Sequence, residues 1–354
     1  MQLWFDWMIS DNCPLLGGER AMALLADGVS ALLIDGKLGA GSAGTFPTLN
    51  PATEEVLGAA ADANAEDMSR AIDAARRAFD DTDWSRDTEL RVRCLRQLRD
   101  AMRAHVEELR EITIAEVGAP RMLTASAQLE GPIDDLAFSA DTAESYQWNQ
   151  DLGEAAPLGI PTRRTIAREA VGWSARSLRG TFRTRSTWPS WAGAGGGQHG
   201  RVETRAGHAV VRRRARRNHC RAHRLSAGVV NIVTSSDHSL GALLAKDPRV
   251  DMISFTGSTA TGRSVMTDAA ANIKKVFLEL GGKSAFVVLD DADLAGACSV
   301  SAFAASMHAG QGCAITTRLV VPRPGTTRRW VLRPPPWGRS NPATPTILPP
   351  CAGR

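Results

Sequence analysis

The spacing of apolar residues predicts long helices in the first half of the chain. Apolar positions three or four residues apart run through residues 66–79, and a longer stripe of the same period runs from Leu90 to Ile112. Arginines and glutamates fill the opposite face of the longer stripe, so its apolar face is expected to lie in a core and not in a cofactor site. Gly118 and Pro120 follow it, as a C-cap glycine and a trailing proline do. Residues 121–147 predict a further helix.

Short apolar runs bounded by turn residues predict strands. Asp35 and Gly36 lie between apolar residues, which favours a hairpin with a type I′ turn over residues 32–38. Residues 151–170 are extended, basic and broken by proline. Further strands are expected at residues 228–233, 252–255, 274–280 and 284–289, with helices at 240–246 and 292–308. Strands that alternate with helices indicate an α/β fold.

Composition narrows the class of protein. The chain has 354 residues, of which 43% are hydrophobic, enough for the cores of two or three domains. Its six cysteines include no C-x-x-C pair and no dense framework, so we expect a reducing compartment, the cytoplasm, and no structural zinc. No apolar run approaches the roughly 20 residues of a membrane span. All but five of the 42 basic residues are arginines, a bias that GC-rich coding DNA produces.

The pattern breaks twice. Residues Trp173–Ser226 hold thirteen arginines, three tryptophans and one acidic residue, and neither a helical nor a strand period continues through them. From Pro322 onward there are six arginines, nine prolines and no acidic residue. We expect the first of these segments to be disordered, because it offers no periodic apolar face to bury.

Two segments carry candidate chemistry. Glu279 ends an apolar run and precedes two glycines, so it can lie in a partly dry cleft where a carboxylate acts as a general base. Cys313 follows Gly310-Gln311-Gly312, which leaves room for a carbonyl compound to reach the sulfur. Taken singly, Glu279 is as well explained as an exposed strand-end carboxylate, and Cys313 as a small buried hydrophobe.

A third segment, Gly257–Gly262, joins a predicted strand to a helix. Its Gly-Ser-Thr start resembles a phosphate-cradling turn, in which backbone N–H groups and a helix N-terminus face an anion. The spacing alone is weak evidence, and without Gly-Lys-Ser/Thr it is not a P-loop.

Together these motifs resemble the aldehyde dehydrogenase superfamily. F-T-G-S at Phe255–Ser258, E-L-G-G-K at Glu279–Lys283 and G-Q-G-C at Gly310–Cys313 occur in the family's order. The resemblance covers about residues 30–172 and 228–321.

The resemblance implies NAD(P)-dependent oxidation of an aldehyde to a carboxylic acid, with NAD favoured over NADP. Cys313 would be the nucleophile that forms a thioester, and Glu279 the base that activates water to hydrolyse it. The residues implied in cofactor binding are Phe255, Gly257, Ser258, Thr259, Gly262, Leu280 and Gly281. The implied partners are a small aldehyde and further copies of the chain, although the assembly of this chain is left open.

The resemblance also implies a division of the chain. The parts are an unassigned extension (1–28), a Rossmann-like NAD(P)-binding domain (29–279), the start of an incomplete α/β catalytic domain (280–321) and an aberrant tail rich in proline and arginine (322–354). The binding domain would include an oligomerisation hairpin at 151–170 and the altered segment at 173–226.

The altered segment replaces family sequence without changing the spacing of the motifs around it. This favours translation in a shifted reading frame, and the tail favours a second shift that runs to an early stop. The alternative is an arginine-rich nucleic-acid-binding insert around Val211–Arg217, but an insert would lengthen the chain. The segment lacks the family's P-W-N-F asparagine, an oxyanion-hole donor, and its K-P lysine. Loss of one such donor costs about 10²–10³ in rate, so we expect this chain to be inactive.

Overall fold

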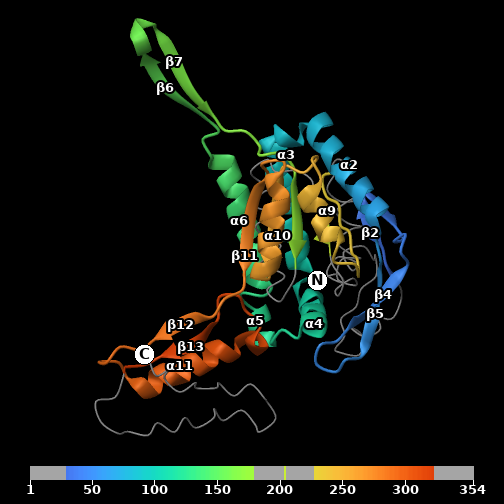
Figure 1. The fold of residues 1–354 in the computed structure, drawn as a ribbon, viewed down its shortest axis with the longest axis vertical. Helices are drawn as coiled ribbons and strands as arrows, with labels where there is room; N and C mark the ends of the chain where they lie inside the picture. The colour runs from blue at the N-terminus through green and yellow to red at the C-terminus, as the bar shows by residue number, and fades with distance from the viewer. Residues whose placement is uncertain (1–28, 179–202, 205–226, 323–354) are drawn as a thin grey trace.

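A four-stranded parallel sheet forms the centre of the fold (Figure 1). The computed structural model describes residues 29–178, 203–204 and 227–322. The strands lie in the order β11–β10–β8–β9, and their bounds are β8 Ser174–Leu178, β9 Glu203–Thr204, β10 Met252–Gly257 and β11 Lys275–Leu280. Parallel neighbours need a crossover, which helix α10 (Thr259–Ala270) supplies between β10 and β11. The predicted α/β fold is confirmed.

The main core lies between this sheet and three helices. Apolar side chains of α2 (Ala65–Asp81), α9 (Leu240–Lys246) and α10 join those of β10 in one buried cluster. Helix α2 begins with a capping box, in which Asn64 and Asp67 each accept a hydrogen bond from the other's backbone N–H. The helices predicted at 66–79 and 240–246 are both confirmed.

A second core forms among helices α3 (Thr88–Ala104), α4 (Val106–Val117) and α6 (Glu130–Ser145). The long apolar stripe predicted one helix, which is wrong, because the backbone leaves the helical region at His105 (φ −124°, ψ 19°). The break lets residues on both sides of it reach the same core from different directions. Residues 121–147 are likewise not one helix, since the short α5 (Arg121–Thr124) and a turn precede α6.

Two predicted turn elements are confirmed. Strands β2 (Leu32–Ile34) and β3 (Lys37–Gly39) form an antiparallel hairpin, and its turn residues Asp35 and Gly36 have the positive φ values, 53° and 72°, that a type I′ turn needs. Gly118 ends α4 in the left-handed conformation, with φ 67°.

The extended basic stretch at 151–170 folds as a second hairpin. Strands β6 (Asn149–Ala155) and β7 (Thr162–Ala167) pair antiparallel around the short turn η4 (Pro157–Gly159), and they project away from the rest of the molecule (Figure 1). Large apolar side chains stay in solvent there, with Leu158 99% and Ile160 62% exposed.

The apolar run at 228–233 does not form the predicted strand. Ile232 makes an isolated antiparallel bridge to Leu33, and its neighbours on either side are outside any strand. The run is buried because it packs beneath α2: a Cβ on Gly228, whose φ is +83°, would lie 2.3 Å from the carbonyl oxygen of Ala74. Burial against a helix, and not strand pairing, explains its apolar character.

The altered segment starts inside the sheet. We expected no strand in Trp173–Ser226, but β8 pairs with β10 over its whole length, and Trp173 and Ala175 are fully buried in the main core. Its residues 179–202 and 205–226 lie outside the described part of the chain, so the expectation of disorder there stays a prediction.

Smaller sheets complete the fold. The three-stranded sheet has the order β1–β5–β4, with bounds Val29–Ser30, Val56–Ala61 and Thr45–Leu49 respectively. A separate parallel pair, β12 (Ser284–Val287) and β13 (Thr316–Val320), is covered by α11 (Leu294–Ser306) and extends from the end of β11 (Figure 1). The short turns η3 (Asp83–Ser85) and η5 (Met307–Gly310) follow α2 and α11.

A charged cluster joins the helices of the second core. The guanidinium of Arg110, 7% exposed, donates to Glu130 at 2.6 Å and to Glu107 at 3.0 Å, and Arg103 donates to Glu130 at 2.9 Å. The hydrogen bonds from Arg110 and then from Arg103 hold the pKa of Glu130 below its ordinary value. Because the folded state holds this proton less tightly than the unfolded state, the cluster stabilises the fold above the ordinary glutamate pKa, and this stabilisation is lost as the pH falls through the lowered one.

We therefore expect Glu130→Gln to reduce the free energy of unfolding at pH 7 by about 1 kcal/mol, because charge-assisted hydrogen bonds at a partly exposed site are lost. The variant should also lose less stability than the parent between pH 7 and pH values below the ordinary glutamate pKa. Urea unfolding across that range measures both. Glu154→Gln, on the exposed hairpin, is the control. An unchanged pH dependence in Glu130→Gln contradicts the assignment.

Candidate functional site

The segments that begin at Gly257 and at Glu279 meet where strands β10 and β11 end, at the carboxyl-terminal edge of the central sheet. Strands β10 and β11 run parallel in register, so Thr256 lies beside Glu279 and Gly257 beside Leu280. The N–H of Gly281 donates to the carbonyl of Gly257 at 3.2 Å, which extends the pairing one residue beyond the strands. The carboxyl ends of parallel strands are where open α/β sheets bind their ligands.

Helix α10 begins at this edge with an exposed first turn. The Ser258 hydroxyl accepts the N–H of Thr261 at 3.1 Å and so caps the helix, while Ser258 and Thr259 face solvent. Gly262 is buried on the other side, where an added Cβ would lie 2.8 Å from Leu280 Cδ2. The glycine therefore lets α10 lie close to the end of β11.

Phe255 supports the turn from within the core. It is 4% exposed, and a Cβ on Gly257 would lie 2.4 Å from its ring. Of the seven residues predicted to bind a cofactor, six lie along the edge and Phe255 lies beneath it. The hydroxyl oxygen of Thr256 is also buried at this edge and has no hydrogen-bond partner among the described residues. Sequence reasoning did not single out this residue, since a threonine in a strand is ordinary.

Glu279 does not lie in the dry cleft that we expected. Exposure alternates along β11, and Glu279 points to its solvent side together with Lys275 and Phe277. An ordinary amphipathic strand pattern explains this orientation. None of the described residues covers the Glu279 carboxylate. The expectation that Glu279 lies in a partly dry cleft is therefore wrong among these residues.

Cys313 is an exposed free thiol between η5 and β13. The turn before it uses positive φ at His308 (56°) and Gly310 (73°), which reverses the chain from α11 toward β13. Glu279 thus lies in the central sheet and Cys313 in the turn before β13, and no hydrogen bond joins their side chains in the part of the chain that the structure describes.

The other described cysteines differ from Cys313 in exposure. Cys94 is buried in α3, and burial raises the pKa of its thiol. Cys298, on α11, is half-buried. Cys313 is therefore the most accessible thiol among the described residues.

Neither a metal site nor a membrane span is found among the described residues. No group of three or more His, Cys, Asp or Glu side chains there is arranged to hold a metal ion. None of the described helices combines the length and apolar character needed to cross a membrane.

Comparison with known proteins identifies relatives along most of the chain. A family model described as "Aldehyde dehydrogenase family" matches residues 39–175 and 218–329 and leaves unmatched a gap inside the altered segment. Aminoaldehyde dehydrogenase 1, peroxisomal, of Pisum sativum is 34% identical over 78% of this chain and 55% of its own length. Betaine aldehyde dehydrogenase of Vibrio vulnificus is 32% identical over 83% of this chain and 60% of its own.

Solved structures match the fold as well. An NAD⁺ complex of an aldehyde dehydrogenase from Bacillus cereus superimposes with a TM-score of 0.76 and 26% identity, over 88% of this chain and 62% of that one. The chain therefore spans between about half and two thirds of the length of the relatives that it matches.

The exposure of the three described cysteines predicts their order of alkylation. Under native conditions iodoacetamide should modify Cys313 at least about 10-fold faster than Cys94, because Cys94 is buried and its thiol holds its proton more tightly. Peptide mass mapping of timed samples separates these sites from the remaining cysteines. In guanidinium chloride the two rates should converge. Equal native rates at Cys94 and Cys313 would mean that the packing around α3 is not as described.

Proposed function

The chain belongs to the aldehyde dehydrogenase family, and from that premise we propose that the edge formed by β10, β11 and α10 binds the dinucleotide for an NAD(P)-dependent aldehyde oxidation. The observation that carries the proposal is the parallel register of β10 and β11, which gathers Gly257, Leu280 and Gly281 beside the start of α10. The first turn of α10 faces solvent, and the positive end of a helix favours a phosphate there.

The residues at this edge fit a dinucleotide in three ways. Ser258 and Thr259 offer exposed hydroxyl and N–H groups to a pyrophosphate. Gly257 lets the turn into α10 lie against the Phe255 ring, where a Cβ would come within 2.4 Å, and Gly262 lets the helix start close to the end of β11. NAD is favoured over NADP, in keeping with the NAD⁺ complex of the Bacillus cereus relative.

In the proposed reaction Cys313 attacks the aldehyde. The thiolate forms a C–S bond to the carbonyl carbon, and the carbonyl oxygen takes up the negative charge. A bound nicotinamide supplies the acceptor for the hydride that leaves this carbon. Glu279 then takes a proton from water as the water oxygen bonds to the thioester carbon, and the C–S bond breaks to return the Cys313 thiolate and release the acid.

We propose further that this chain does not turn over by itself. Glu279 and Cys313 are both exposed, so neither has the dry surroundings that strengthen a general base and protect a thioester from water. The unmatched residues 176–217 support the proposal that this part is translated in a shifted frame and has lost an oxyanion donor.

The projecting hairpin β6–β7 is proposed to serve self-association. Its tip exposes Leu158 and Ile160, which an isolated chain would leave in water. The spacing of the six cysteines, with no C-x-x-C pair and no dense framework, supports placing the protein in a reducing compartment, the cytoplasm.

The dinucleotide site is tested by Gly257→Ala. A Cβ there would lie 2.4 Å from the Phe255 ring, so the turn must shift, and we expect NAD⁺ binding to weaken at least about 10-fold by calorimetry. Gly39→Ala is the control, because an added Cβ meets open space at that position. If Gly257→Ala binds NAD⁺ as the parent does, or the parent binds none, the site is not here.

The catalytic roles are tested in a chimera that carries the matched residues of this chain and takes all other segments from an intact relative. Cys313→Ala should abolish acyl-enzyme formation with an aldehyde and NAD⁺. Glu279→Gln should still form the acyl-enzyme and stall at hydrolysis, which intact-mass measurement detects as an accumulated adduct. Full turnover in Cys313→Ala contradicts the assignment of the nucleophile.

A further inference from the structure

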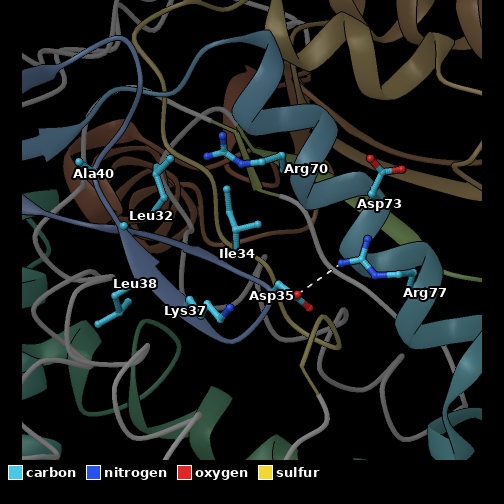
Figure 2. A pocket seen from close by; sticks show the side chains of 10 residues that line it. Leu32, Ile34, Asp35, Lys37, Leu38, Ala40, Arg70, Asp73 and Arg77 are labelled. Carbon is cyan, nitrogen blue, oxygen red and sulfur yellow. Dashed lines mark hydrogen bonds and ion pairs between the residues drawn. The ribbon is translucent and has the colours of Figure 1, made fainter.

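A cavity of about 380 Å³ lies between the β2–β3 hairpin and helix α2, and it shares no residue with the proposed dinucleotide site (Figure 2). Its size is in the range that holds small organic ligands. The residues that line it are Leu32, Ile34, Asp35, Lys37, Leu38, Gly39, Ala40, Arg70, Asp73 and Arg77.

Three cationic side chains border this cavity. Arg70 and Arg77 are seven residues apart on one face of α2, and both reach from the helix toward the hairpin (Figure 2). Lys37 lies on the hairpin and has no ion-pair partner among the described residues. The cavity therefore offers guanidinium and ammonium donors from two sides.

Arg77 is the donor most easily taken by a ligand. Its ion pair with Asp35 is long, 3.3 Å, and the side chains are 56% and 40% exposed. Such a pair contributes about 0–1 kcal/mol, so a ligand anion that binds the guanidinium in a bidentate manner can displace it.

Arg70 is held more firmly. It donates to Asp67 at 2.5 Å, and the fully buried Asp67 carboxylate also accepts hydrogen bonds from Ser42 and Asn64. One Nη group of Arg70 is engaged in this pair, so the guanidinium is fixed at the cavity wall while its other N–H groups remain as donors.

The rest of the lining selects the kind of anion. Ile34, on the face of the hairpin that also carries Lys37, provides an apolar surface suited to a hydrocarbon body. Asp35 also borders the cavity and disfavours a dianion, whereas Asp73 is balanced by Arg249 at 2.6 Å. A monoanion on an apolar body matches this combination better than phosphate does.

We propose that this cavity binds a small monocarboxylate with an aromatic or branched aliphatic body. The carboxylate pairs with Arg77 in place of Asp35, with Lys37 and Arg70 nearby, and the body lies against Ile34. The inference concerns a second site, so it stands or falls separately from the catalytic proposal.

The test uses 4-fluorobenzoate as the probe, observed by ¹⁹F NMR titration of the full chain. A ligand of this size is expected to bind with a dissociation constant of about 1 mM. Arg77→Ala should weaken binding about 10-fold or more, and Lys37→Gln should weaken it less. Arg86→Ala removes an arginine that is 79% exposed elsewhere on the surface and should leave binding unchanged.

A neutral analogue of the probe and an inorganic anion test whether the charge and the apolar body are both required. 4-Fluorobenzamide, which has the same shape without the charge, should bind at least about 10-fold more weakly, and inorganic phosphate should not displace 4-fluorobenzoate. Equal binding of the amide, an unaffected Arg77→Ala variant, displacement by phosphate, or no binding at about 10 mM would each overturn the proposal. A result on NAD⁺ binding at the β10–β11 edge leaves this outcome unaffected, because the two sites share no residue.

Discussion

The pairing of β10 with a parallel strand on each side is the interaction on which the rest of the fold depends. On one side β11 fixes the edge where Gly257, Leu280 and Gly281 meet, and on the other β8 continues the sheet. The buried side chains Ile253 and Phe255 project from β10 into the core formed with the helices. The position of the proposed dinucleotide site is thus a consequence of strand register and not of any single side chain.

The contact between β8 and the rest of the sheet shows how a segment of altered composition can still join a core. The Asp251 carboxylate accepts the Trp173 N–H at 2.9 Å and the guanidinium of Arg76 at 2.7 Å, and the Trp173 indole donates to the carbonyl of Arg249. Gly172 permits this approach, since a Cβ there would lie 2.2 Å from the Asp251 carboxylate. In the rest of β8, strand pairing uses the main-chain N–H and C=O groups, which every residue except proline carries, so a segment of altered composition can still pair with β10.

Sequence alone predicted the elements whose causes are local. The type I′ turn at Asp35 and the C-cap at Gly118 follow from the backbone freedom of the residues themselves. The break at His105 was not predictable, because the apolar period continues across it. The exposure of Glu279 and the conformation of residues 228–233 both depend on which distant segments cover them. An apolar run has the same sequence pattern whether it is buried under a helix or within a sheet. The cavity was missed because its donors come from segments about forty residues apart that only the fold brings together.

The pairing of Ser174 with Met252 closes a backbone loop of 78 residues. The entropic cost of closing such a loop rises only with the logarithm of its length, so doubling it adds about 0.6 kcal/mol. The thermodynamics of the central sheet are therefore nearly indifferent to how many residues separate its strands. The folding rate does depend on this separation, because contacts between remote segments form late, and the newly made chain must wait for β10 before β8 is paired on both sides.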